Sequence, residues 1–309
     1  MLGEEKEMKV LVIGSCALDV IIDLEKLPSL NEDVNTKDLA MSLGGMAYNV
    51  YNVIKLFGRD AIFGCPIGEG ILANIVKGFL SEKGYEPIGT IKGVDNGMCM
   101  CLVDDSKERS FISHHGAEYR FEPELFKDID FNEVDWIYFG GLEIEDVDGP
   151  KIIDFIADKP SNLFFAPGPR LDNIDQKRLE RIYALKPVLH INEREAELIT
   201  GKQDLIANAE EISALTRNTV IITLGEKGTL LKEVNKEVII IPTQEVKMVD
   251  STGAGDNHAG AILACLNQGM SFEEAIKIAN VISGYVVRQK GASLTKENYD
   301  KAMNDLQCK

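Results

Sequence analysis

The chain has 309 residues and a formal net charge of −17 at pH 7, from 33 Lys and Arg against 50 Asp and Glu. Such an acidic composition argues against nucleic-acid and anionic-membrane partners, which require a basic patch. The first ten residues, MLGEEKEMKV, are acidic and contain no secretory apolar segment, and the apolar runs elsewhere are far shorter than a membrane span. The six cysteines are scattered without zinc-type spacing, so we expect free thiols and a cytoplasmic protein.

The first part of the chain alternates short apolar strands with helices that end at glycine. The predicted strands are residues 9–14, 19–24 and 61–64, and the predicted helices are residues 47–57 and 70–83. Residues 98–103 and 109–113 do not follow this alternation of strands and helices. They are two β-like runs around a polar tip, which is typical of a hairpin. Residues 33–41 are a further candidate strand. Since no helix separates these pieces, they are predicted to form a small sheet outside the main one, inserted from about 15–42 and 97–115.

Strands and helices alternate again in the rest of the chain. Further strands are predicted at residues 136–139, 163–166, 188–191, 220–224, 229–234 and 238–242, and further helices at 150–157, 175–184, 193–200 and 257–268. Ser271 and Glu274 form a capping box that begins one more helix. This α/β pattern predicts a largely parallel sheet flanked by helices.

The most informative segment is VDSTGAGD, residues 249–256, which runs from a strand-like region into an amphipathic helix. Gly253, Ala254 and Gly255 leave the backbone bare, so successive N–H groups can point at an anion in front of the positive end of the helix dipole. A carboxylate at the same place, Asp256, is explained if the anion is a phosphoryl group in transit and Asp256 deprotonates the attacking group. The alternative is an ordinary tight turn between a strand and a helix.

Five strings, in this order along the chain, resemble the ribokinase-like (phosphofructokinase-B type) carbohydrate kinases: GGMAYNVYNVIKLFG, NEREAELITG, TLGEKG, DSTGAGD and ANVISGYVVRQKGAS. The resemblance covers essentially the whole chain. It implies one domain over residues 8–309, a three-layer αβα sandwich with a mostly parallel sheet and a β-sheet lid. It also implies ATP-dependent phosphorylation of a hydroxymethyl group on a small sugar. A nucleoside kinase of the adenosine or pseudouridine type is the nearer alternative, and a non-catalytic sugar- or nucleotide-sensing protein is the more distant one.

The resemblance also implies roles for residues that handle the phosphoryl group. Asp256 matches the catalytic base, and residues 253–255 match the anion hole that stabilises charge on the transferred group. Asn192 and Glu195 match an Asn-x-x-Glu motif linked to phosphate and to Mg²⁺, which Glu195 would bind through water. Without the resemblance, a helix cap and a solvated face would explain this pair. K⁺ near Asp250 is a further implication.

The residues implied to bind the two substrates are spread along the chain. On the ATP side, the resemblance matches a glycine turn and one position of the adenine pocket: Thr223, Gly225, Gly228 and Asn280. On the acceptor side, it matches an early acidic residue and a diglycine motif: Asp19, Gly44, Gly45 and Asn49.

Three histidines and the lid edges are further candidates. His258 lies two positions after Asp256, so the helix turns it away from that carboxylate and favours a packing or pocket role. His114 and His115 end the candidate hairpin and favour the surface, with substrate contact as the alternative. An open edge of the lid sheet invites pairing, which leaves a monomer and a homodimer through the lid strands as alternatives.

Overall fold

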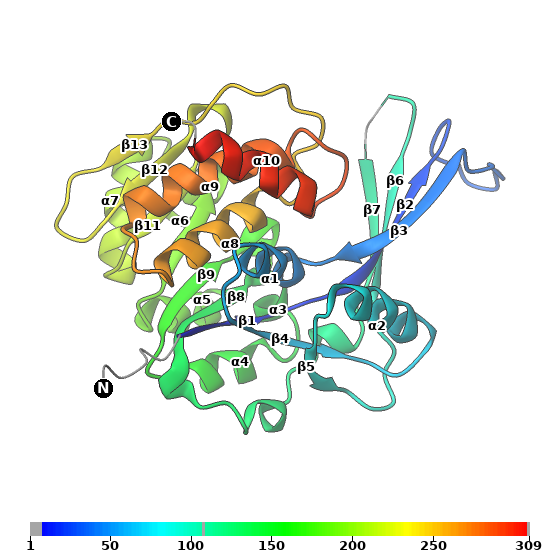
Figure 1. The fold of residues 1–309 in the computed structure, drawn as a ribbon, viewed down its shortest axis with the longest axis horizontal. Helices are drawn as coiled ribbons and strands as arrows, with labels where there is room; N and C mark the ends of the chain where they lie inside the picture. Colours follow the sequence, from blue (N-terminus) through cyan, green and yellow to red (C-terminus); the bar gives the residue numbers. More distant parts are fainter. Residues whose placement is uncertain (1–7, 107–108, 308–309) are drawn as a thin grey trace.

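The computed structural model describes residues 8–106 and 109–307. Within these ranges, nine strands form the main sheet in the order β13–β12–β11–β10–β9–β8–β1–β4–β5 (Figure 1). Their bounds are β1 Lys9–Ile13, β4 Ala61–Ile67, β5 Pro87–Thr90, β8 Val134–Gly140, β9 Asn162–Ala166, β10 Val188–Asn192, β11 Val220–Thr223, β12 Thr229–Lys232 and β13 Ile239–Ile241. Neighbouring strands are parallel except at β11–β12 and β12–β13.

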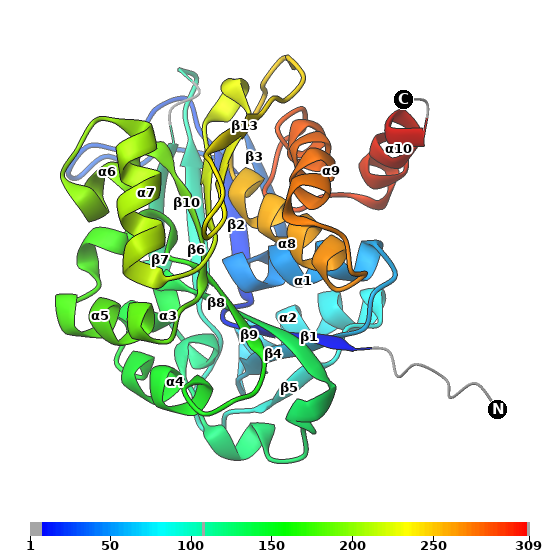
Figure 2. The same ribbon diagram turned by 90° about the vertical axis from the view of Figure 1, so that its left-hand side faces the viewer.

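Helices cover both faces of the main sheet (Figure 2). Successive side chains of β1 point to opposite faces of the sheet, so this strand contributes to two hydrophobic cores. Val10 and Val12 belong to one core, and Leu11 and Ile13 belong to the other. The first core includes α1 Met46–Leu56, α2 Ile71–Lys83, α8 Ala254–Leu266, α9 Phe272–Val286 and α10 Lys296–Gln307. The second includes α3 Gly141–Glu145, α4 Gly149–Ile156, α5 Gln176–Ala184, α6 Glu193–Thr200 and α7 Leu205–Thr216. The predicted three-layer αβα sandwich is confirmed.

A second sheet stands out from one side of the sandwich (Figure 1). In the described part of the chain it has four strands in the order β3–β2–β6–β7. Their bounds are β2 Ala17–Asp23, β3 Asp38–Gly44, β6 Met98–Val103 and β7 Arg109–His114. Parallel pairing of β2 with β6 joins the two insertions, and β6 and β7 form the predicted hairpin. The predicted lid sheet is therefore confirmed, although β3 begins at Asp38 and not at residue 33.

Several elements differ from the sequence predictions. Helices α7 and α10 and strand β5 were not predicted, and β5 contains Pro87 and Gly89, which lower β propensity. Helix α8 begins at Ala254, three residues earlier than predicted, directly after Gly253 in a left-handed conformation. Asp256 therefore lies within the first turn of α8. No helix in residues 8–106 or 109–307 has the length and apolar character that a bilayer crossing requires.

Candidate active site

The first turn of α8 presents unpaired backbone N–H groups. Gly253 has φ 75°, and a Cβ there would lie 2.1 Å from the carbonyl oxygen of Ala292, so only glycine fits. The N–H of Ala254 donates to the carbonyl of Ser251 at 3.2 Å. The N–H groups of Gly255 and Asp256 have no acceptor among the described residues, and a Cβ at Gly255 would enter open space. The geometry thus leaves at least these two N–H groups available to an anion at the positive end of α8.

The Asp256 carboxylate is held by a hydrogen bond from α1. Asn49 donates from Nδ2 to Asp256 Oδ2 at 3.0 Å, and its Oδ1 accepts from the Ser293 hydroxyl at 2.6 Å. Burial raises the pKa of Asp256 to about 7; the hydrogen bond from Asn49 opposes this shift, and the nearby charges of Glu143 and Glu195 add to it. A carboxyl group with this pKa can exchange protons near neutral pH.

Two buried polar groups near Asp256 lack partners in the described structure. Glu143 accepts from the backbone N–H of Ser15 at 2.7 Å through Oε1, whereas its Oε2 and the Tyr138 hydroxyl have no hydrogen-bond partner. A Cβ built at Gly140 would lie 2.8 Å from Glu143 Oε2 and 3.8 Å from the Tyr138 hydroxyl. Both atoms therefore lie close to the same position in space. Such orphaned groups are costly unless a ligand or water satisfies them. Neither residue stands in a recognisable motif, so the sequence missed them.

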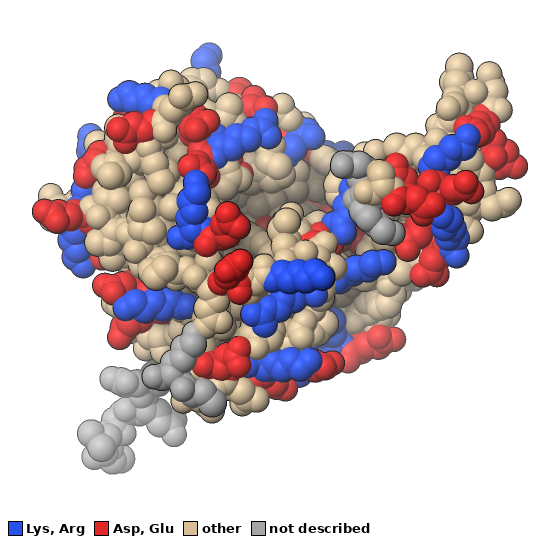
Figure 3. All heavy atoms as spheres, turned by 90° about the horizontal axis from the view of Figure 1, so that it is seen from above, with Lys and Arg blue, Asp and Glu red and all other residues tan. Residues whose placement is uncertain are grey.

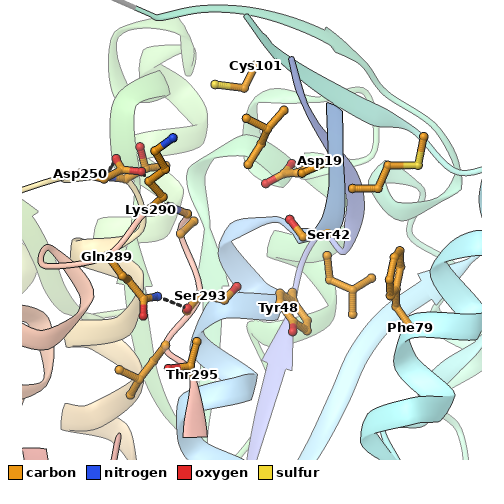
Figure 4. A pocket seen from close by; sticks show the side chains of 18 of the residues that line it. Asp19, Ser42, Tyr48, Phe79, Cys101, Asp250, Gln289, Lys290, Ser293 and Thr295 are labelled. Carbon is orange, nitrogen blue, oxygen red and sulfur yellow. Dashed lines mark hydrogen bonds between the residues drawn. The ribbon is translucent and has the colours of Figure 1, made fainter. Parts of the chain in front are cut away.

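A cavity of about 630 Å³ lies between the lid sheet and the loop that connects α9 to α10. Figure 3 shows the surface hollowed between the sandwich and the lid. In the close view of Figure 4, Asp19 and Ser42 approach the cavity from the lid strands, and Lys290 and Ser293 from the opposite wall. Asp256 does not line this cavity itself; it is connected to the wall through Asn49 and Ser293.

The diglycine motif packs closely against Asp19, which lines this cavity, and against the backbone of Ser15. A Cβ at Gly44 would lie 2.1 Å from Oδ2 of Asp19, and one at Gly45 would lie 2.4 Å from the carbonyl oxygen of Ser15. Burial raises the pKa of Asp19 to about 6. The structure thus brings together Asp19, Gly44 and Gly45, with Asn49 in the helix that follows.

The residues predicted for ATP, apart from Asn280, lie at or next to the carboxyl ends of β10 and β11. Asn192 and Thr223 are paired across these strands, and the turn after Thr223 contains Gly225. Asn192 and Glu195 form a capping box: Asn192 Oδ1 accepts from the N–H of Glu195 at 2.9 Å, and the Glu195 carboxylate accepts from the Asn192 N–H at 3.0 Å. A Cβ at Gly228 would lie 2.2 Å from the carbonyl oxygen of Ile241, so Gly228 is required by packing.

Asn280 lies in the interior. Its Oδ1 accepts from the Thr229 hydroxyl at 2.7 Å and lies 3.0 Å from His258 Nε2, and its Nδ2 donates to the carbonyls of Ile241 and Pro242. The structure therefore places its amide in a polar network of the core. His258 belongs to the same network, and its Nδ1 lies 2.9 Å from Nε2 of His190. Burial lowers the pKa of His258 to about 4, so it is neutral at pH 7 and serves the packing role that its spacing favoured.

The other two histidines lie outside the cavity wall. His114 is exposed at the end of β7. His115 pairs with Asp146 at 2.9 Å and stacks on Tyr119, with ring centroids 3.8 Å apart.

Asp250 is occupied by donors from three segments. Its Oδ1 accepts from the Thr252 N–H at 2.9 Å and from the guanidinium of Arg109 on the lid, and its Oδ2 accepts from the Gly291 N–H at 3.0 Å. Burial favours a higher pKa, but these hydrogen bonds outweigh it and lower the pKa of Asp250 to about 2. Arg109 was not singled out from the sequence, because the hairpin pattern does not indicate which Lys or Arg side chain of the lid contacts the αβα sandwich.

No three His, Cys, Asp or Glu side chains in the described ranges come together in an arrangement that would hold a metal by themselves. A Mg²⁺ ion that keeps several waters and binds through phosphates needs fewer protein ligands.

Known proteins resemble this chain along most of its length. The model of the pfkB family carbohydrate kinases matches residues 7–298. An uncharacterized sugar kinase of Escherichia coli, YegV, is 28% identical over 290 residues, which are 91% of this chain and 89% of that protein. A nucleoside kinase of Methanocaldococcus jannaschii is 23% identical over 98% of each chain. The crystal structure of ribokinase from Thermotoga maritima has the same fold, with a TM-score of 0.81, 24% identity, and coverage of 96% of this chain and 99% of that one. The chain therefore belongs to the pfkB family of carbohydrate kinases, which are phosphotransferases with an alcohol group as acceptor.

Proposed function

We propose that the protein transfers the γ-phosphate of ATP to a hydroxymethyl group of a small sugar, with Asp256 as the general base. The observation that carries the proposal is the first turn of α8, where a carboxyl group with a pKa of about 7 lies beside the unpaired N–H groups of Gly255 and Asp256. A proton acceptor and an anion cradle are the two parts that phosphoryl transfer to a hydroxyl requires.

The proposed step forms one bond to phosphorus and breaks another. Asp256 accepts the proton of the sugar hydroxyl while the hydroxyl oxygen attacks the γ-phosphorus. The bond between the γ-phosphorus and the oxygen that bridges it to the β-phosphate breaks, and ADP leaves with the electron pair. The N–H groups at the start of α8 stabilise the charge on the three equatorial oxygens during transfer. Asn49 keeps the carboxylate oriented toward this point by its bond at 3.0 Å.

The acceptor is proposed to bind between the lid and α1. Asp19 accepts hydrogen bonds from the sugar hydroxyls, and Gly44 and Gly45 let them approach the backbone. The unpaired Oε2 of Glu143 and the Tyr138 hydroxyl supply further partners near Asp256. A sugar that satisfies these groups removes the cost of their burial, which favours polyhydroxylated substrates.

ATP is proposed to bind along the carboxyl ends of β10 and β11. Asn192, Thr223, Gly225 and the Gly228 turn lie there, and Asn280 supports this edge from the core. The Glu195 carboxylate uses one hydrogen bond at each oxygen in the capping box, which leaves lone pairs for the water shell of Mg²⁺. Bound Mg²⁺ would neutralise phosphate charge.

The identity of the acceptor is tested by a panel of sugars and nucleosides with ATP and Mg²⁺, read by ADP release. We expect a sugar to be the preferred acceptor. The cavity also contains the aromatic side chains of Tyr48, Phe79 and Phe111, which could stack against a base, so preference for a nucleoside would select the second candidate. Absence of acceptor-dependent ADP release with every compound would contradict the kinase proposal and favour the sensing role.

Cellular location and assembly complete the proposal. We place the protein in the cytoplasm, where ATP is available. We also propose a homodimer through the lid, because both edge strands carry exposed apolar side chains: Leu39 and Met41 on β3, and Phe111 and Ile112 on β7. Analytical ultracentrifugation of the protein and of a variant with charged residues at Leu39 and Met41 tests the dimer.

A further inference from the structure

One arginine joins the lid to the loop that leads into α8. Arg109, the first residue of β7, pairs through its guanidinium with the Asp250 carboxylate, and its Nη1 lies 2.8 Å from the Thr252 hydroxyl oxygen. The Arg109 side chain is 27% exposed and that of Asp250 only 2%, so the pair is largely shielded from water. A shielded pair is screened far less by salt than a surface ion pair.

The carboxylate that Arg109 contacts is the one near which the family resemblance implied K⁺. A potassium site needs oxygen acceptors that converge on an open position. Here the Asp250 carboxylate already receives the guanidinium and the N–H groups of Thr252 and Gly291. A cation bound to this carboxylate would lie beside the Arg109 guanidinium and be repelled by it, so the residues present do not fit a bound K⁺.

We propose that Arg109 is a built-in cation of this loop, which replaces K⁺ and couples the position of the lid to the anion-binding turn. Asp250 lies shortly before Ala254, the first residue of α8. An unpaired Asp250 carboxylate would therefore repel a phosphate held by the N–H groups of Gly255 and Asp256. The Arg109 guanidinium cancels that charge.

Arg109 also restrains the loop that it neutralises. Its guanidinium holds the Thr252 hydroxyl as well as the Asp250 carboxylate, and the next residue, Gly253, begins the turn into α8. Both contacts are made by Nη1, so one nitrogen of the rigid, planar guanidinium holds both groups, whereas a lysine ammonium on its flexible stem would hold them less rigidly. Arg109 is thus a positioning residue for the proposed phosphoryl transfer, on which this inference rests.

The test compares the full-length protein with Arg109→Ala and Arg109→Lys in potassium and in tetramethylammonium buffers. We expect wild-type turnover to differ by less than about two-fold between the two cations, because the guanidinium is always present. Arg109→Ala should lose roughly tenfold or more in tetramethylammonium, as expected when one partner of a shielded charge pair is removed, and should regain part of it in potassium. Arg109→Lys should remain independent of potassium.

A second readout separates this inference from the proposed function. If K⁺ fills the vacated position, it should raise the melting temperature of Arg109→Ala above that in tetramethylammonium, whether or not an acceptor has been identified. The wild type should show no such difference. The matched control is Lys37→Ala, which removes a lid cation that pairs with Asp105 on the lid itself. Strong activation of the wild type by K⁺, or an Arg109→Ala variant with no potassium response in either readout, would overturn the inference.

Discussion

Asn49 Nδ2 donates to Asp256 Oδ2 at 3.0 Å, although the two residues are 207 positions apart in the chain. The Ser293 hydroxyl fixes the orientation of the Asn49 amide by donating to its Oδ1 at 2.6 Å. A donor to the ionised carboxylate lowers the pKa of Asp256 and so opposes the effect of burial. The bond therefore keeps the pKa of the proposed base below the value that burial alone would give.

Replacing Asn49 by Leu should move this pH upward. The variant removes the donor and leaves burial as the dominant influence, so the acid limb of the kcat/KM profile should shift to higher pH than in the wild type. Ser293→Ala, which leaves the donor in place, is the matched comparison and should shift the limb less. An unchanged limb in Asn49→Leu would show that the bond does not tune Asp256.

Replacing Asp256 by Asn should separate activity from stability. Without the proton acceptor we expect kcat to fall by about 10²–10⁴. The variant should not lose stability. The pKa of Asp256 is raised from 3.8 to about 7 on folding, so the free energy of unfolding of the wild type falls as pH rises through this interval. At pH 8 the variant should therefore melt at the same or a higher temperature.

The control for this variant is Glu273→Gln, which changes an exposed carboxylate in the first turn of α9 that pairs with Lys277. It should alter neither turnover nor melting temperature appreciably. Loss of activity in Asp256→Asn together with a clearly lower melting temperature at pH 8 would indicate structural damage instead.

Replacing Gly44 by Ala should weaken binding of the acceptor. The added Cβ would lie 2.1 Å from Oδ2 of Asp19, so the carboxylate must move. We expect the KM for the acceptor to rise by about tenfold or more, while the KM for ATP changes little. Gly78→Ala in α2 is the control, because a Cβ there meets no atom within 4 Å. Equal effects on both KM values would argue against a specific acceptor role.

Replacing Gly255 by Val should block the anion cradle without disturbing the core. A Cβ at this position meets no described atom within 4 Å, so the larger side chain fits without a clash and stands next to the unpaired N–H of its own residue. We expect kcat to fall by about 10²–10³, comparable to the loss of an oxyanion donor. Gly255→Ala should have a smaller effect, and circular dichroism should show a retained fold. Normal turnover in Gly255→Val would place the phosphoryl group elsewhere.

The sequence predicted the fold more completely than the contacts within the site. Apolar runs and glycine ends located most strands and helices, because period and turn chemistry are local properties. The start of α8 was placed three residues late, since the left-handed conformation of Gly253 cannot be read from its identity alone. Helix α7 was missed even though Asp204 caps its first turn.

The site contacts depend on residues that only the tertiary structure brings together. Arg109 reaches Asp250 across 141 positions, and Glu143 carries a carboxylate oxygen that has no partner among the described residues and that no sequence pattern marks. The ATP contact that the resemblance implies for Asn280 stays a prediction, and its amide contacts with Thr229, His258 and the carbonyl of Ile241 could not be inferred from the sequence. Side-chain direction across an interface is set by packing, which a single sequence does not contain.

The pH dependence of kcat/KM for the preferred acceptor tests the central role of Asp256 most directly. Because the carboxyl group must be ionised to accept a proton, activity should rise with pH along an acid limb centred near 7, with ionisation of Asp19 near 6 contributing below it, and then reach a plateau. The residual activity of Asp256→Asn should lack this limb. A wild-type profile that is flat from pH 5 to 8, or a limb that persists unchanged in the variant, would contradict the assignment of Asp256 as the base.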